Sequence, residues 1–539
     1  MSDSKARIIS DAISLPFAVD SREAIEIAKR KLKRVNGVNA SDFSFSIFRR
    51  STDARKKDDI RFVYTVLAET EHAAIRDGEA LVGAGFRICP DQEIRYAFGT
   101  EKSAYRPIVV GSGPAGMFCA LMLAEQGYRP ILIERGEAID RRISTVDSFF
   151  CGGDLNVESN VMFGAGGAGT FSDGKLVTRI NDPLCGYVFS RLCDFGAPRE
   201  IVVQAKPHIG TDLLQGVVSR LLERIKECGG EIHYNCRLDA VSEPDTGGIV
   251  AHTSLGDFSG SCIVLAIGHS ARDTYKYLND SGYSLKAKPF SVGVRIEHLR
   301  SDIESALYGK HAGDPRLGAA EYALSDTKSG RGVYTFCMCP GGDVIAAASE
   351  EGGVVVNGMS RHARDGKNSN SAVAVSVNPF DYDGTPLGAI EFQRDLEKRA
   401  FVLGGGNFSA PIELLGDYLV GKQSGLSAPS RIMPGYTRQQ TRIEDISRVF
   451  PEFVNDELRR GFLAFGKKIK GFDAPDAVMT AVESRTSAPI RIMRNELRVA
   501  EGHSFVYPCG EGAGYAGGIT SAAIDGIKTA LAIIERFAP

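Results

Sequence analysis

The clearest ligand-binding signal in this chain is the spacing of three glycines. Gly111, Gly113 and Gly116 give the pattern G-x-G-x-x-G, directly after the apolar run 108–110 and before a helix expected over 117–126. In such a turn the first glycine permits the tight bend, the second lets a pyrophosphate approach the backbone, and the third lets the helix pack on the strand. The pattern predicts a dinucleotide site with phosphate oxygens at a helix N-terminus.

An acidic residue and two further glycine-rich stretches extend this prediction. Glu134 follows a second apolar run, 131–133, where a carboxylate can accept hydrogen bonds from ribose hydroxyls. Residues 163–175 hold too many glycines for a strand or helix interior, and such backbone often approaches a flat or charged ligand closely. Gly517-Gly518 precedes a helix expected over 521–537 and can direct its N-terminus toward an electron-rich ligand atom.

Candidate catalytic side chains are less specific. His269 directly follows Gly268 at the end of a buried strand, where it can either reach a ligand or cap a turn. Four cations can either anchor an acidic substrate, because guanidinium forks match carboxylates, or form ordinary ion pairs: Lys175, Arg179, Arg295 and Arg485.

The segment Cys337-Met338-Cys339 suggests redox chemistry at first sight. Its spacing is C-x-C rather than C-x-x-C, and no helix start is evident that would lower a thiolate pKa, so we favour a structural role. The nine histidines show no paired spacing, so no metal site is expected.

Bulk composition describes an ordinary globular protein with more than one domain. The chain has 539 residues, of which 43% are hydrophobic and 24% charged, and its formal net charge is −3. With so small a net charge, the protein as a whole has no electrostatic attraction to nucleic acid or to an anionic membrane. The first residues lack the apolar stretch of a signal peptide, no membrane span is expected, and the 11 scattered cysteines fit a reducing compartment, so we expect a cytoplasmic protein.

Residues 1–100 precede the predicted dinucleotide-binding segment, and their pattern predicts a small α+β domain. Strands are expected over 13–17, 43–48 and 60–68, and helices over 72–83 and from a Ser21 cap to Lys33. The charged segment Arg49–Asp59 can be a loop that binds nucleic acid or phosphate, or a solvated hairpin. Because aspartates offset about half of its positive charge, we favour the hairpin.

The remaining chain predicts an α/β fold, in which a Rossmann-like domain (101–287 and 477–539) is interrupted by a mostly β substrate or cap domain (288–476). In the first part we expect a helix over 211–228 and strands over 231–235, 237–241, 249–253 and 258–265, the last ones forming an antiparallel meander. In the cap domain we expect strands over 292–297, 333–337, 344–348 and 372–377 and helices over 391–403 and 445–468. Gly404-Gly405-Gly406 fits a helix C-cap better than a second nucleotide turn.

The glycine motifs, in this order, resemble those of FAD-binding proteins of the glutathione-reductase and p-hydroxybenzoate-hydroxylase superfamily. Over nearly its whole length the chain looks like the bacterial family described as NAD(FAD)-utilising dehydrogenase or FAD-dependent protein. Residues 166–176 and 510–520 match that family closely. The resemblance is specific for FAD and does not name a substrate.

The resemblance implies FAD contacts for individual residues. On the adenosine and pyrophosphate side these are Gly111, Gly113, Pro114, Ala115, Gly116, Glu134, Arg135 and the backbone of Leu238. The resemblance also implies contacts from the glycine-rich stretch 163–175 and from Gly268, at the end of a buried strand. The residues of the stretch are Gly169, Thr170, Gly174 and Lys175. Gly510 and Glu511 match a Gly-Asp pair that binds the ribityl–phosphate region, although Glu is one methylene longer. Gly518, Ile519 and Thr520 would lie under the flavin N1 and O2 edge, where the helix dipole stabilises the negative charge of reduced flavin.

These features predict an FAD-dependent oxidoreductase, a dehydrogenase or reductase, that moves hydride through flavin N5 to or from a small molecule. Only one convincing dinucleotide fold is present, so NAD(P)H, if used, would bind transiently. An acidic small molecule is one candidate substrate, and neither membrane nor DNA is an expected partner. The alternatives are an FAD-dependent RNA-modifying enzyme, in which Arg49–Lys57 grips RNA, and an FAD-binding regulatory protein without redox turnover.

Overall fold

The computed structural model describes residues 6–35, 38–71, 78–89, 94–178, 180–245, 247–438 and 440–539. The described residues form two compact units. The first comprises Met1–Arg95, Arg179–His208 and Glu304–Ala320, and the second comprises Tyr96–Thr178, Ile209–Ile303 and Glu321–Pro539. Sequence reasoning did not anticipate that 179–208 and 304–320 belong with the N-terminal residues. The domain boundaries expected above remain predictions.

The first unit is built on a five-stranded antiparallel sheet. The strand order is β2-β4-β1-β5, and β3 also pairs with β4. Its elements are β1 (Ala6–Ser10), β2 (Ile13–Pro16), α1 (Arg22–Leu32), β3 (Ser44–Asp53), β4 (Arg61–Thr70), α2 (Gly78–Gly83), β5 (Phe86–Ile88) and α5 (Leu184–Asp194). Part of the helix expected over 72–83 lies outside the described residues. α8 (Arg300–Tyr308) contains the boundary between the two units at residue 304.

The expected hairpin in this unit is confirmed, because β3 and β4 pair antiparallel on either side of residues 54–60. Its aspartates neutralise nearby cations, with Asp53 2.6 Å from Arg55 and Asp59 3.2 Å from Arg61. The expected Ser21 cap is wrong in its chemistry. Ser21 has helical backbone angles and its hydroxyl makes no capping bond, while Asp20 accepts from the Arg22 amide instead.

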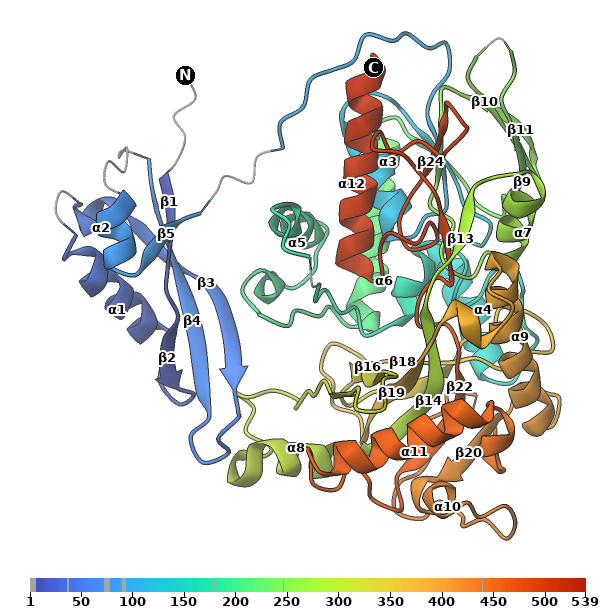
Figure 1. Ribbon diagram of the computed structural model, residues 1–539. Helices are drawn as coiled ribbons and strands as arrows, with labels where there is room; N and C mark the ends of the chain where they lie inside the picture. The colour runs from blue at the N-terminus through green and yellow to red at the C-terminus, as the bar shows by residue number, and fades with distance from the viewer. Residues whose placement is uncertain are drawn as a thin grey trace. The chain divides into compact units, whose positions relative to one another are not determined.

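The second unit contains the predicted parallel sheet, with strand order β24-β12-β6-β7-β8. These strands are β6 (Ile108–Val110), β7 (Ile131–Ile133), β8 (Glu231–His233), β12 (Ile263–Leu265) and β24 (Val506–Pro508), and β6, β7, β12 and β24 are entirely buried. The expected helices are present as α3 (Pro114–Glu125), α6 (Thr211–Glu227) and α12 (Ile519–Arg536). Helix α12 packs beside α3 (Figure 1), and α3 packs against β6 and β7.

One expected strand is wrong. Residues 258–265 do not form a single strand, because β11 (Gly256–Gly260) ends the meander β11-β10-β9 and β12 starts in the parallel sheet. The partners of β11 are β10 (Ile249–Thr253) and β9 (Leu238–Ser242). Gly260 marks the change of sheet, since a Cβ there would lie 2.8 Å from the Ile108 side chain. The expected strand joined two unlike stretches, the largely exposed β11 and the fully buried β12.

Residues 288–476 form the mostly β layer that the sequence predicts, and β22, which lies beyond residue 476, joins its sheet. Its seven-stranded sheet has the order β15-β16-β19-β14-β22-β20-β21. The strands are β14 (Phe290–Leu299), β15 (Ser325–Asp326), β16 (Val333–Cys339), β19 (Asn368–Val377), β20 (Ala410–Leu414), β21 (Thr441–Ile443) and β22 (Val478–Glu483). Two small ladders join β17 (Asp343–Ala346) to β18 (Val356–Met359) and β13 (Leu285–Ala287) to β23 (Ile490–Ile492).

The remaining helices are α4 (Ile139–Phe150), α7 (Arg272–Asp280), α9 (Pro386–Leu403), α10 (Leu415–Val420) and α11 (Glu452–Gly466). Gly404 is the C-cap of α9, as expected. Among the described residues, no helix is both long and apolar enough to cross a membrane.

Candidate functional site

The carboxyl ends of the parallel strands open into a cavity of about 330 Å³. In open parallel sheets this edge is where ligands bind. Most of the predicted site residues line this one cavity: Gly111, Gly113, Pro114, Ala115, Glu134, Arg135, Gly169, Lys175, Leu238, Gly268, His269, Arg485, Glu511, Gly518 and Ile519. Segments separated by hundreds of residues therefore meet at one place.

The other predicted contacts lie in the framework of the wall. Gly116 packs against Gly111. Thr170 Oγ1 donates to Ala165 O, Gly174 N donates to the Ser172 hydroxyl, and Thr520 Oγ1 donates to Leu176 O at 2.8 Å. Gly510 N donates to Asp525 at 2.8 Å. Arg179 lies outside the described residues.

The three motif glycines have different physical roles. Gly111 has a φ of +94°, and a Cβ there would lie 2.4 Å from Ala266 O. A Cβ on Gly116 would lie 1.8 Å from Gly111 O. By contrast, a Cβ on Gly113 would meet nothing closer than the Gly167 Cα at 3.9 Å. The fold itself therefore requires Gly111 and Gly116, whereas Gly113 leaves open space at the start of α3 that a bound group can use.

A second helix N-terminus faces the same cavity. Gly518 is the N-cap of α12, and neither Gly517 nor Gly518 would bring a Cβ within 4 Å of another atom. The first N–H groups of a helix have no partner inside the helix and carry its positive dipole end. Each of these two termini is suited to an anionic or electron-rich group of a ligand.

Glu134 is a rigid part of the site. Its carboxylate accepts from Ser112 N and Oγ at 2.8 and 2.7 Å, and from the amides of Gly136 and Gly164 at 3.0 Å each. These four bonds fix the turn and the glycine-rich stretch to the tip of β7. A contact with a ribose stays a prediction.

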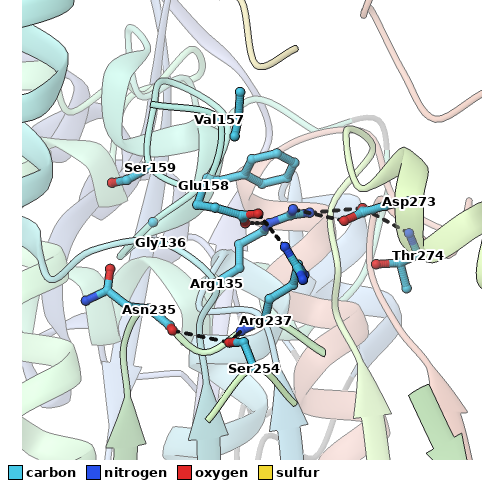
Figure 2. A network of polar contacts seen from close by, with 12 residues as sticks. Arg135, Gly136, Val157, Glu158, Ser159, Asn235, Arg237, Ser254, Asp273 and Thr274 are labelled. Atoms are coloured by element: carbon cyan, nitrogen blue, oxygen red, sulfur yellow. Dashed lines mark hydrogen bonds and ion pairs between the residues drawn. The ribbon is translucent and has the colours of Figure 1, made fainter. Parts of the chain in front are cut away.

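Arg135 forms a network at the cavity rim (Figure 2). It donates two hydrogen bonds to Asp273, at 3.0 and 2.9 Å, and one to Glu158 at 2.8 Å. Arg237, which also lines the cavity, reaches the other oxygen of Glu158 at 2.7 Å. The two cations at this rim are therefore held by acidic residues of the protein itself.

Arg142, which sequence reasoning missed, organises the glycine-rich stretch. It is fully buried, and its guanidinium donates to five backbone carbonyls, those of Asn160, Val161, Gly164, Ala165 and Gly167. Burial lowers its pKa to about 10, so it stays charged at neutral pH. No sequence motif marks this role of Arg142, because its partners are backbone oxygens, which every residue has.

His269 and Arg485 lie in one polar chain at the cavity wall. His269 Nδ1 is 3.0 Å from Ser270 Oγ, which accepts from Arg485 at 3.1 Å. Burial and the nearby Arg485 and Arg272 lower the pKa of His269 to about 4. Arg485 also makes a bidentate pair with the buried Glu397, at 3.0 and 2.8 Å, and donates to Ser349. Its donors are thus engaged by the protein, which favours a positioning role over direct anchoring of a substrate.

The remaining cations are also paired. Arg295 is fully buried and bound to Glu483, Asn370 and Asn357. Lys175 pairs with the buried Asp173 at 2.9 Å. Burial alone would raise the pKa of Asp173, but Lys175 and Arg364 lower it to about 2.

Glu511 faces the cavity in a different electrostatic state from the acids above. Burial raises its pKa to about 7, and Lys288 only partly opposes this effect. A carboxyl group that is partly protonated at neutral pH can donate a hydrogen bond to a phosphate or hydroxyl oxygen.

Family comparisons place these features in a class of flavoproteins. Residues 106–166 match an FAD binding domain, residues 289–486 match a family described as "FAD-dependent protein, C-terminal domain-like", and residues 10–69 match a domain of unknown function. An uncharacterised protein from Clostridium beijerinckii is 45% identical over 522 residues, which cover 95% of this chain and 96% of that protein. The chain belongs to the same family as that protein, a family of FAD-dependent proteins.

Solved structures are only distantly similar. A variant of the halogenase PltM in complex with FAD is 12% identical, covering 80% of this chain and 68% of its own, with a TM-score of 0.37. Glycine oxidase from Geobacillus kaustophilus is 10% identical, covering 80% and 93%, with a TM-score of 0.34. Similarity at this level says nothing of the reaction that this chain performs.

Proposed function

We propose that this protein is an FAD-dependent oxidoreductase that moves hydride to or from a small molecule, with NAD(P)H as a candidate transient donor. One observation carries the proposal. The glycine-bearing starts of α3 and α12, at Gly113 and Gly518, line the same cavity at the carboxyl edge of the parallel sheet. FAD supplies two-electron chemistry when bound, and the chain contributes orientation and electrostatics.

The chain's own groups have distinct tasks in this proposal. The first amides of α3 bind phosphate oxygens, where Gly113 leaves room for close approach. The first amides of α12 favour negative charge on the group that they face. The wall that includes Leu238, Ala266 and Phe163 excludes water from the bound cofactor.

His269 is the side chain that we propose to exchange hydrogen bonds or protons with the substrate. Because Arg485 donates to the Ser270 hydroxyl, that hydroxyl can donate its own hydrogen to Nδ1 of His269. The neutral imidazole then carries its proton on Nε2 and offers a hydrogen-bond donor. With a pKa near 4, this state persists throughout the neutral range.

The first experiment is a visible spectrum of the freshly purified protein, followed by anaerobic addition of NADH and of NADPH. We expect flavin bands that bleach with one of the two nucleotides. If both leave the bands unchanged, a screen of small metabolites tests whether a substrate reduces the flavin directly. Protein that holds no flavin and cannot be reconstituted with FAD would overturn the proposal. Bound flavin that no donor reduces would support the regulatory alternative.

A further inference from the structure

Two thiols and a lysine meet at a part of the cavity wall that the proposed function does not use. Strand β16 has an irregularity in its pairing with β19 between Phe336 and Cys339, and Cys337 has a φ of +44°. Bulges of this kind re-aim side chains and recur next to active sites. Cys337 lines the cavity, whereas Cys339 is fully buried behind it. Both are free cysteines.

The two thiols are separated by Met338 alone, on the irregular segment of β16. Cys339 Sγ donates to the Cys337 carbonyl oxygen at 3.4 Å, so its thiol lies against the backbone of Cys337. Lys175 donates to the carbonyl oxygen of Met338, between the two cysteines, and Arg295 donates to that of Cys337 at 2.8 Å. Two cations therefore border a pair of thiols that has one face on the cavity.

The surroundings shift the pKa values of the two thiols in opposite directions. The neighbouring Cys339 thiol, followed by Lys175 and Arg295, holds the pKa of Cys337 well below that of an ordinary thiol. The neighbouring Cys337 thiol and burial raise the pKa of Cys339. Asp173, beside Lys175, and Glu483, beside Arg295, are the acids that oppose these cations. An attacking thiolate beside a protonated second thiol is the arrangement that thiol–disulfide exchange requires.

We propose that Cys337 and Cys339 form a redox-active dithiol that reduces small disulfides entering the cavity. The Cys337 thiolate attacks one sulfur of a disulfide RSSR, the S–S bond breaks, and RS⁻ leaves. Cys339 then gives up its proton and attacks the Cys337 sulfur, which releases the second RS⁻. The dithiol loses two electrons and becomes the Cys337–Cys339 disulfide, while RSSR becomes two thiols after protonation. An excess of a small thiol drives the reverse reaction and restores the pair.

This proposal replaces the structural role favoured by the C-x-C spacing. That argument relied on the missing helix start, but here Lys175 and Arg295 supply the positive charge instead. Their sequence separation from the cysteines hid this environment from motif analysis.

The test uses the full-length protein and 2-hydroxyethyl disulfide as the probe. Trypsin releases the peptide Gly332–Arg361, which contains Cys337 and Cys339 and no other cysteine. After exposure to the probe and blocking of free thiols, we expect this peptide to lose two hydrogens. The exposed Cys151 instead forms only the mixed disulfide or stays free to be blocked. In Cys339→Ser the reaction stops at the mixed disulfide on Cys337.

A second measurement addresses the attacking thiol. We expect Cys337 to react with iodoacetamide at pH 6 at least ten times faster than Cys151. Lys175→Met removes most of that advantage and Lys175→Arg restores it. Circular dichroism checks that each variant is folded. A folded protein in which Cys337 reacts no faster than Cys151, or in which the peptide never loses two hydrogens, would overturn the proposal.

Discussion

Glu134 accepts two hydrogen bonds from Ser112, one from its amide at 2.8 Å and one from its hydroxyl at 2.7 Å. Together with the amides of Gly136 and Gly164, they saturate the carboxylate. The acid at the tip of β7 thus stabilises the fold of the turn, whatever it contributes to a ligand.

The first prediction concerns Glu134→Gln. An amide has only one acceptor oxygen, so its NH₂ group must face backbone N–H donors and leave at least one of them unpaired. We expect a loss of about 1–3 kcal/mol in the free energy of unfolding, measured by urea denaturation without FAD. Ser112→Ala, which removes only the hydroxyl bond, should lose about 1 kcal/mol. If Glu134→Gln weakens FAD binding and leaves the unfolding of the flavin-free protein unchanged, the structural role is wrong.

The second prediction concerns Gly113→Ala, which should weaken FAD binding without destabilising the fold. Gly113→Ala places a methyl group where the structure has room, so the flavin-free protein should keep its stability within about 1 kcal/mol. We expect its Kd for FAD to rise at least ten-fold, about 1.4 kcal/mol, because the methyl group occupies the proposed phosphate space. Gly83→Ala is the matched control, since its methyl group also meets open space but does not line the cavity. Equal FAD affinity of the two variants would contradict the proposed position of the pyrophosphate.

The third prediction concerns Arg142→Lys. Lysine keeps the charge but has three donors on one nitrogen, so it cannot reach all five carbonyls that the guanidinium binds. We expect about 3 kcal/mol of destabilisation and faster hydrogen exchange in residues 160–169. Arg141→Lys, on the same helix, is the control, because the Arg141 side chain is exposed. Unchanged exchange in 160–169 would show that Arg142 does not hold this stretch.

The fourth prediction is a pH dependence. Glu297 is fully buried in β14. One carboxylate oxygen accepts from Asn368 and Gly435, while the other is without a partner in the part of the chain that the structure describes. Burial raises its pKa from 4.5 to about 7. The folded state then holds a proton that the unfolded state releases above pH 4.5, so this group's contribution to stability falls as pH rises from 4.5 to 7.

Glu297→Gln removes that titration while keeping a neutral side chain. We expect the free energy of unfolding of the variant, minus that of the wild type, to rise by about 3 kcal/mol between pH 4.5 and 7. The slope is about 1.4 kcal/mol per pH unit. Urea unfolding at several pH values measures the difference. Glu496→Gln, at an exposed position, should show none. A flat difference for Glu297→Gln would mean that its carboxyl ionises normally.

The fold was largely predictable from local pattern. The strands at 108–110 and 131–133 and the helix of the glycine turn follow from apolar runs and turn chemistry, which act within a few residues. The change of sheet at residues 260–263 was missed. The expected strand joined β11, whose sequence GDFSG is largely exposed, to β12, whose sequence IVL is fully buried, and so ran across the tight packing of Gly260 on Ile108.

The cavity was predictable as a set of glycines, but its polar framework was not. Asp525 of α12 accepts from Arg494 and Arg498 as well as from the Gly510 amide. No motif marks it, since its partners come from distant segments and from the backbone. The same is true of Arg142, and of Lys175 beside the two cysteines.

Thr520, at the first turn of α12, donates to the carbonyl of Leu176, and its neighbours Gly518 and Ile519 line the same cavity as Gly111. During synthesis the ribosome makes the turn at Gly111 long before it reaches α12. Until α12 has been made, a nascent chain therefore has only one of the two helix N-termini that the proposed FAD site needs. Under the proposed function FAD needs both helix N-termini, so we expect retention of flavin to report that α12 has docked beside α3.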